Sequence, residues 1–521
     1  MSKEKPINLY MGSDPAYRAG LAHKLVKSGV VDFCLADYNP RDDENHEVTG
    51  SIVTVSPGDG IQANYGGTAK LSEMPALSRY LLEAMSLYES TAISFGIRRT
   101  NFPMTSYEDE RRMYHIHLRY WNYMLDKYKI NALFFDSIPH TQHKYIIYAL
   151  GKIKNIPMLI VEATSFGTIR LYGDDIHTIG EPIKDYYQKL IESGVPDERI
   201  ELKGEIKAWY ELYTKSLEEI KAAKNPWKDN FTKDKQKETR EFLHKPYLGI
   251  KGYFRPQIIT IRNFASSILS HHGMKYYKES EEYRRKYVLH SRLAKVYLST
   301  SAVSLKKYNR IAVNADYTEK YIIFFPQQTP EGSTLPTAGV FSTQYLSVQL
   351  LARAAKRLGI WVYVKEHYVQ PTREWTFYHD LSSIDNVKLI KTTESTYDLI
   401  YKAVAISTQT GTCILEGVLM GTPVLCVGNG YAYKGMPGVF EVNDEDEAFE
   451  SLEFIENGYS IDKGELKKYF YAMQETSVPY DFVYADTDKT GKFDFERYEE
   501  TQTHLYNMIR NFVKENKGLS E

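Results

Sequence analysis

Cysteine is scarce in this sequence, with only Cys34, Cys413 and Cys426 among 521 residues. An odd and widely spaced set provides no disulfide framework and no CxxC metal pair, which is typical of a protein in a reducing compartment. The N-terminal sequence MSKEKPINLYMGSD contains no long apolar region, so we expect no signal peptide. Together these features favour a cytoplasmic protein.

Long hydrophobic runs and an excess of one charge are also missing. No segment approaches the roughly 20 apolar residues that a membrane-spanning helix needs. The formal net charge is −2, so no overall basic field favours nucleic acid as a partner. Residues 251–298 are locally basic and aromatic, which fits either a solvated helical face or peripheral contact with the inner face of a membrane.

The order of apolar segments predicts an α/β fold with more than one domain. Short strands alternate with helices from residue 6 onwards and again from about residue 320, which is typical of parallel sheets with crossover helices. The intervening region is helical and rich in Lys, Glu and Tyr. We predict two doubly wound domains, at residues 1–179 and 311–475. Residues 180–310 would form a helical insertion or connector between them, and residues 476–521 a C-terminal tail with a helix.

A strand-to-helix turn in STQTGTCILEGVLMGTPVLCVG (407–428) has the features of an anion site. Thr410, Gly411 and Thr412 follow a predicted strand, and the amides that open the next helix favour an anion. Gly411 allows close approach and the threonine hydroxyls can bind phosphate, although capping of the helix without a ligand is the alternative. Glu416, inside this apolar helix, suits the hydroxyls of a ribose unless it faces solvent.

Two further predicted strands end in polar side chains. The motif YVKEH places Lys365 and His367 on one side of an extended strand and Glu366 on the other. A cation beside an imidazole suits a phosphate or diphosphate, although a strand that simply runs into a polar loop gives the same pattern. Gln327 ends the first strand of this half of the chain, within FFPQQ.

Three motifs resemble the C-terminal half of bacterial surface-carbohydrate and capsular-polysaccharide glycosyltransferases of GT-B architecture: FFPQQTPEGST, YVKEH and STQTGTCILEGVLMGTPVLCVGNGYAYKGMPGVF. Capsular Kdo transferases and the glycerophosphotransferases of teichoic acid synthesis share parts of this pattern. The resemblance covers roughly residues 320–445, with Tyr368 where proline is usual, and residues 130–172 resemble the acceptor-side segment. It implies a GT-B-like fold, in which two Rossmann-like domains face a cleft.

The resemblance also implies substrates and site residues. A nucleotide-activated sugar would bind the C-terminal domain, and a glycan or lipid-linked acceptor would bind the N-terminal domain. Lys365, His367 and the turn at 410–412 would hold the phosphates, with Gln327 beside them, and Glu416 would hold the ribose or sugar hydroxyls. Neither a metal nor another cofactor is expected.

Glycosyl transfer needs a base for the acceptor hydroxyl, which should come from the N-terminal domain. Asp136, His140 and Glu162 are the candidates, because each lies at a predicted strand end or in the turn after it. His140 can act near neutral pH without a large pKa shift, although Pro139-His140 also fits a plain turn. The choice among the three stays open.

The predicted function is therefore a glycosyltransferase that moves a sugar from a nucleotide-activated donor to a growing surface glycan, such as a capsule or a lipopolysaccharide. A sugar-nucleotide epimerase is one alternative, because it can share the two-domain fold. A non-catalytic glycan-binding or export-coupled protein is the other.

Overall fold

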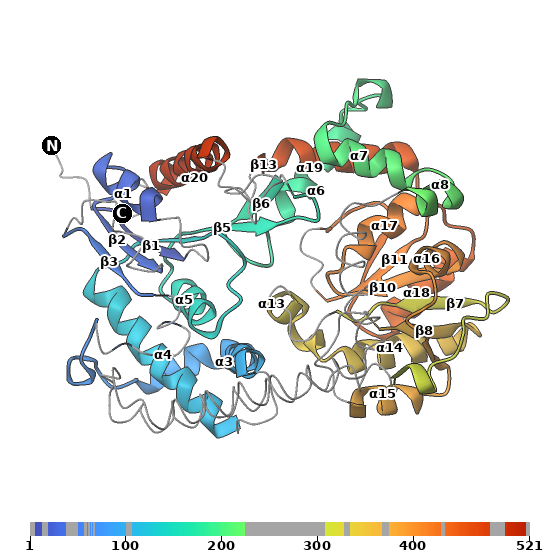
Figure 1. The fold of residues 1–521 in the computed structure, drawn as a ribbon, viewed down its shortest axis with the longest axis horizontal. Coiled ribbons are helices and arrows are strands. Elements are labelled where there is room, and N and C mark those ends of the chain that lie inside the picture. The colour runs from blue at the N-terminus through green and yellow to red at the C-terminus, as the bar shows by residue number, and fades with distance from the viewer. Residues whose placement is uncertain are drawn as a thin grey trace, which may run out of the picture.

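The computed structural model describes most of the chain (Figure 1). It leaves undescribed residues 1–5, 13–18, 38–49, 57–59, 61–62, 64, 66–67, 101–106, 168, 224–307, 328–333, 367–374, 429–432, 480–494 and 517–521. The basic, aromatic segment 251–298 and the candidate His367 therefore lie outside the described residues. Among the described helices, none is both long and apolar enough to cross a bilayer.

The first sheet has seven strands in the order β13-β6-β5-β4-β1-β2-β3. Its parallel strands are β1 (Asn8–Gly12), β2 (Phe33–Asp37), β3 (Ile52–Thr54), β4 (Ala132–Phe135) and β5 (Met158–Ala163). Two antiparallel strands extend one edge, β6 (Ile169–Gly173) and β13 (Val478–Pro479). The order of the five parallel strands is that of a Rossmann sheet, and it reverses between β1 and β4.

Helices cover both faces of this sheet because successive side chains of a strand point to opposite sides. Leu9 and Met11 pack into a core with α1 (Ala19–Lys27) and α20 (Phe495–Asn516). Tyr10, between them, belongs to the core on the other face. That face is covered by a layer of three helices, α3 (Arg79–Thr100), α4 (Tyr107–Lys127) and α5 (Gln142–Ile153).

The second sheet has six parallel strands in the order β12-β11-β10-β7-β8-β9. They are β7 (Tyr321–Phe324), β8 (Trp361–Lys365), β9 (Val387–Ile390), β10 (Ala405–Thr408), β11 (Val424–Val427) and β12 (Val439–Val442). This order also reverses once, between β7 and β10. The predicted class is confirmed: the chain is an α/β protein with two doubly wound, Rossmann-like units of GT-B-like fold.

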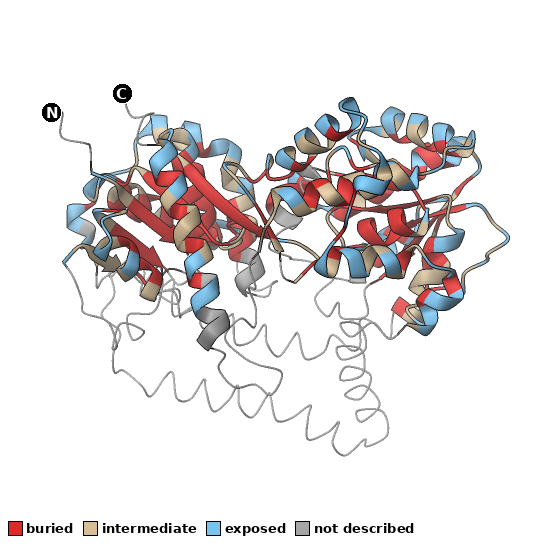
Figure 2. Cartoon of the chain, turned by 90° about the horizontal axis from the view of Figure 1, so that it is seen from above, coloured by how far each residue is buried: buried red, intermediate tan, exposed pale blue. Residues whose placement is uncertain are grey.

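The helices of the second unit again lie on both faces of its sheet. One core contains α14 (Gln344–Arg357), α15 (Trp375–Ser382) and α18 (Glu445–Glu456). The opposite core contains α16 (Thr396–Lys402) and α17 (Cys413–Met420). Gly421 ends α17 with a φ of 86°, a conformation that glycine adopts without strain, and the chain then turns back into β11. Figure 2 shows the strands of both sheets buried and the outer helix faces exposed.

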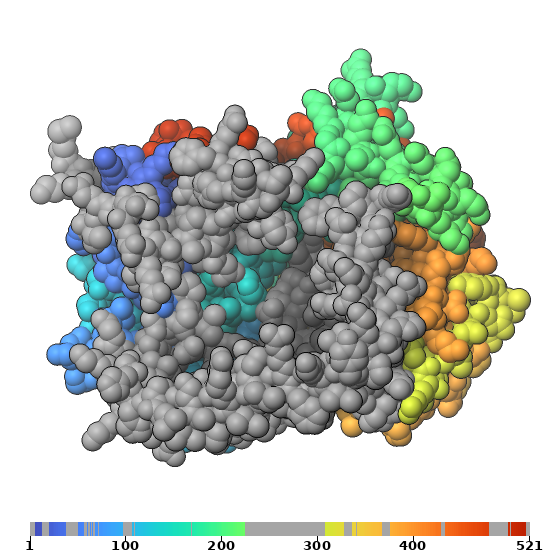
Figure 3. All heavy atoms as spheres, viewed as in Figure 1, coloured from blue at the N-terminus to red at the C-terminus, as the bar shows by residue number. Residues whose placement is uncertain are grey.

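Two helices that follow the first sheet along the chain pack on the second unit. After β6 come α6 (Glu181–Glu192), α7 (Gly204–Tyr213) and α8 (Leu217–Ala222). In the second unit, α13 (Thr334–Ala338) follows β7. Helix α7 packs on α17 and α8 on α16, while α19 (Lys463–Thr476) packs on α6. Figure 3 shows the green surface of α7 and α8 against the orange surface of the second unit. The predicted domain boundaries stay a prediction, since residues 224–307 are not described.

The side chain of Tyr308 joins the ends of two neighbouring strands, β8 and β9. Its hydroxyl lies 2.6 Å from the carbonyl oxygen of Ile390 and 3.0 Å from that of Val364. The same oxygen accepts a hydrogen bond from the amide of Glu366 at 3.1 Å. All of these groups are buried, so bulk water does not compete for them in the folded chain.

We therefore expect Tyr308→Phe to lower the free energy of unfolding by about 1–3 kcal/mol, because it leaves buried strand-end groups without a partner. Urea unfolding followed by circular dichroism measures the change. The matched control is Tyr401→Phe on α16, where the side chain is exposed, and it should alter stability by less than about 0.5 kcal/mol. Equal midpoints for both variants would show that the hydroxyl of Tyr308 does not stabilise the strand ends.

Candidate functional site

The point where the second sheet reverses its strand order brings two polar segments together. Gln327 follows β7 and Thr408 ends β10, and the side-chain amide of Gln327 donates to Thr408 Oγ1 at 2.7 Å. The side chain of Gln344 on α14 holds the backbone of Gln327 in place. Its Oε1 accepts from the backbone N–H of Gln327 at 2.7 Å, and its Nε2 donates to the backbone carbonyl of Gln327 at 3.0 Å. Ligands of doubly wound sheets bind at this kind of switch point.

Gly411 lies directly against this pair. A Cβ atom at Gly411 would overlap Nε2 of Gln327 and would lie 3.1 Å from Thr408 Oγ1 and 3.2 Å from Cys413 Sγ. Only glycine lets the turn pass this close to the amide. The structure thus brings Gln327 and Gly411 together from positions more than 80 residues apart.

The two threonines of the turn differ in exposure. Thr412 is exposed and Thr410 is half-buried. Thr412 occupies the N-cap position of α17, but its side chain makes no capping hydrogen bond. The alternative of plain capping is therefore wrong for Thr412.

Lys365 and Glu366 point to opposite faces of the sheet, as the strand alternation predicts. Lys365, with 7% of its surface exposed, donates to Thr396 Oγ1 at 3.1 Å, at the start of α16. Glu366 accepts from the hydroxyl of Tyr378 on α15 at 2.7 Å. The strand register puts Lys365 level with Thr408, about 10 Å away across two strand spacings.

Glu416 is buried, with 4% of its surface exposed, so the alternative of a solvent-facing Glu416 is wrong. The hydroxyl of Tyr213 on α7 donates to Glu416 Oε1 at 3.1 Å and lies 3.3 Å from the hydroxyl of Tyr397. Burial, followed by the charge of Glu416, raises the pKa of Tyr213, so Tyr213 stays a protonated donor. Sequence reasoning missed this partner, which lies 203 residues from Glu416 along the chain.

The three candidate bases lie at the carboxyl edge of the first sheet. Asp136 follows β4 and is almost fully buried, with 1% exposed. Glu162 lies in β5, and its Oε2 accepts from the amide of Ile138 at 2.9 Å. His140 Nδ1 lies 2.9 Å from the carbonyl oxygen of Ile138, which can only accept, so Nδ1 carries the proton. Nε2 of half-buried His140 is then the basic nitrogen.

The carboxyl edges of the two sheets meet. Ser165, in the turn after β5, places its Oγ 3.5 Å from Oγ1 of Thr412 at the start of α17. Tyr433, from the loop after β11, is buried against the same contact, and this burial raises the pKa of Tyr433 to about 12 even though a hydrogen bond to Ser165 lowers it. The segment that holds Glu162 therefore lies across from the turn that holds Gly411.

The sequence interpretation missed a second buried group at the edge of the first sheet. Asp37, the last residue of β2, is fully buried. Its Oδ2 accepts a hydrogen bond from Nε2 of His143 at 3.1 Å and lies 3.6 Å from Nζ of Lys144. Both partners are residues of α5. The rule that selected Asp136, a carboxylate at a strand end, also selects Asp37.

No metal or other cofactor is predicted, and the structure does not test this. Within the described ranges, no three His, Cys, Asp or Glu side chains gather into a group that could hold a metal ion.

No protein-family model and no curated protein matches the sequence. Among solved structures, the chain is similar to a KpsC β-Kdo 2,7 transferase from Thermosulfurimonas dismutans, with 16% identity over 41% of this chain and a TM-score of 0.23. That match spans 62% of the transferase chain, less than two thirds of it. The present chain is also similar to a UDP-GlcNAc 2-epimerase from Methanocaldococcus jannaschii. The identity is 9%, the match covers 90% of this chain and 98% of that chain, and the TM-score is 0.25. A Neisseria meningitidis UDP-GlcNAc 2-epimerase bound to UDP-GlcNAc has 12% identity, the same coverages and a TM-score of 0.24.

We expect Gly411→Ala to displace the Gln327 amide and to lower the free energy of unfolding by about 1–3 kcal/mol through overpacking. Chemical denaturation measures this, and Gly50→Ala is the control, because a Cβ atom there meets nothing within 4 Å. In a Gln327→Ala background the cost of Gly411→Ala should fall, since the overlapping group is gone. An unchanged cost in that background would show that the two residues do not press on one another.

Proposed function

We propose that the chain is a glycosyltransferase that moves a sugar from a nucleotide-activated donor to a growing surface glycan. One observation supports the proposal: the 3.5 Å contact between Ser165 Oγ and Thr412 Oγ1, which joins the segment after β5 to the start of α17. A transferase needs donor and acceptor groups on opposite sides of one reaction site, and two facing Rossmann-like units provide this.

The donor would bind the second unit. Its phosphates would lie at the Gly411 turn, where the first amides and the dipole of α17 favour negative charge. Lys365, at the same sheet edge, would neutralise charge that develops on the leaving phosphate. Glu416 would accept hydrogen bonds from ribose or sugar hydroxyls, with its carboxylate held in place by Tyr213.

The acceptor would bind the first unit, with His140 as its base. Asp136 is almost fully buried and Glu162 holds the backbone of Ile138, whereas His140 is more exposed and has its basic nitrogen defined. The acceptor oxygen would form a bond to the anomeric carbon as the bond to the leaving phosphate breaks. The hydroxyl proton would pass to Nε2 of His140, and the nucleotide would leave with the bonding electrons.

A donor panel tests the binding half of this proposal. UDP-, GDP-, CMP- and CDP-linked sugars are compared by thermal unfolding, since a ligand that binds only the folded chain raises its melting temperature. We expect stabilisation by one nucleotide class. Lys365→Met should weaken its binding about 10- to 100-fold, the effect of a lost charged hydrogen bond.

Lys356→Met is the matched control, because it removes an exposed lysine from α14 that pairs with Asp385. It should leave donor affinity unchanged. If no donor stabilises the protein, or if both variants bind it as the parent chain does, the donor site is assigned wrongly.

His140→Ala should lower turnover at least 100-fold while donor affinity changes less than about twofold, because a base acts on the acceptor. Release of nucleotide in the presence of a glycan acceptor measures turnover. His379→Ala, at an exposed position on α15, is the control. Unchanged turnover in His140→Ala would remove His140 from the reaction. Conversion of the donor to an epimer without any acceptor would instead identify an epimerase.

A further inference from the structure

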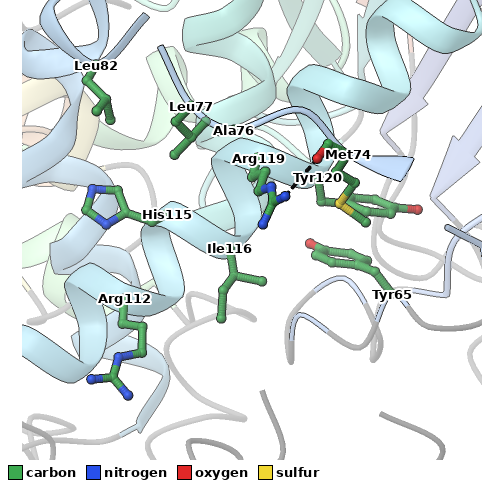
Figure 4. Close-up of a pocket in the computed structure, with 10 residues that line it drawn as sticks. All are labelled: Tyr65, Met74, Ala76, Leu77, Leu82, Arg112, His115, Ile116, Arg119 and Tyr120. Carbon is green, nitrogen blue, oxygen red and sulfur yellow. Dashed lines mark hydrogen bonds between the residues drawn. The ribbon is translucent and has the colours of Figure 1, made fainter. Parts of the chain in front are cut away.

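A second concave site lies on the first unit, and its lining residues differ from those of the candidate site. It is a pocket of about 370 Å³ between α4, the start of α3, Tyr65 and the stretch from Met74 to Leu77 (Figure 4). A volume of this size is within the range of small-molecule sites. None of the donor or base candidates lines it.

One wall of the pocket is cationic. Arg112, His115 and Arg119 recur on α4 at intervals of three and four residues, so they lie on one side of the helix. Arg119 is fixed, because its Nε and Nη2 donate to the carbonyls of Pro75 and Met74 at 3.0 and 2.7 Å. Burial lowers the pKa of His115, so the permanent charge comes from the two arginines. The described lining residues include no carboxylate.

The other walls are apolar and rigid. Leu77 and Leu82 lie across the pocket from Arg112, and Ile116 lies between Arg112 and Arg119 (Figure 4). The ring of Tyr65 stacks on that of Tyr120, with centroids 3.5 Å apart and planes 3° apart. This buried pair packs beneath the apolar wall.

The hydroxyl of Tyr65 is hydrogen-bonded to side chains of the core of the first unit. It accepts from Trp121 Nε1 at 2.9 Å and lies 2.6 Å from His117 Nδ1. The phenol is therefore bonded to the protein interior. With 1% of its surface exposed, Tyr65 supports the pocket from the core and offers little surface of its own to a ligand.

We infer that this pocket binds an amphipathic anion, namely a phosphate or a similar acid carried by an alkyl chain. The aliphatic wall would take the chain, and the guanidinium of Arg112 at the rim would take the acid. The volume equals about a dozen water molecules, which suits a chain of roughly eight carbons. This inference is independent of the proposed function, because the two sites share no residue.

A neutral apolar ligand and a bare anion fit the same walls less well. A neutral chain gives the exposed Arg112 guanidinium no anion to bind, and inorganic phosphate leaves the apolar wall hydrated. Octyl phosphate combines both parts and is therefore the probe of choice. Octanol and inorganic phosphate each supply one part.

Calorimetric titration of the full chain with octyl phosphate, below its micelle concentration, tests the inference. We expect one saturable site and binding at least about tenfold tighter than that of octanol or inorganic phosphate. Arg112→Gln should weaken octyl phosphate about tenfold or more, the effect of a lost charged contact. Arg199→Gln, which removes an exposed arginine between α6 and α7, should leave the affinity unchanged.

Two results would overturn the inference: octanol binding as tightly as octyl phosphate, or equal affinity in Arg112→Gln and the parent chain. Sedimentation with phosphatidylglycerol and phosphatidylcholine vesicles then separates two sources of the ligand. Binding to the anionic vesicles that Arg112→Gln abolishes assigns a membrane lipid. Octyl phosphate binding without vesicle binding assigns a free amphiphile, and both outcomes support the pocket.

Discussion

Parallel pairing makes every strand of a sheet end at the same edge, and the candidate site depends on this constraint. Gln327, Lys365 and Thr408 come from strands spread over more than 80 residues, yet the β8-β7-β10 order places them side by side. The first sheet collects Asp37 and Asp136 in the same way. The contact between Ser165 and Thr412 then joins the edges of the two sheets, so that segments far apart in sequence lie beside one another.

Much of the fold follows from local patterns. The apolar strands of both Rossmann-like units were predicted because each is a short buried run between a glycine or polar turn and an amphipathic helix. Sequence did not reveal β3, β6, β12 and β13. Strand β13 has only two residues, and its pairing of Val478 with Arg170 joins segments about 300 residues apart. Such edge strands are stabilised by their neighbours, so their own sequences carry little signal.

Sequence predicted the parts of the candidate site that follow from strand alternation and from polar residues at strand ends. It did not predict contacts that depend on how distant helices pack. Alternation correctly separated Lys365 from Glu366, and the strand rule placed Gln327 and Gly411 at one edge. The search for carboxylates at strand ends would also have found Asp37, which was overlooked. Tyr213 was beyond reach, because only the packing of α7 on α17 brings its hydroxyl to Glu416. A buried carboxylate in an apolar helix signals that some partner exists, but not which residue supplies it.

The final helix has a consequence for how the chain is made. Helix α20 covers the face of the first sheet that carries Leu9 and Met11, and its own Leu505 and Ile509 complete that core. A ribosome that adds about 5–20 residues per second needs roughly half a minute to a minute and a half to reach this helix after β1. The first unit to emerge is therefore the last to be finished. Its apolar face must be shielded during elongation, by transient collapse or by a chaperone, while the second unit is already able to fold.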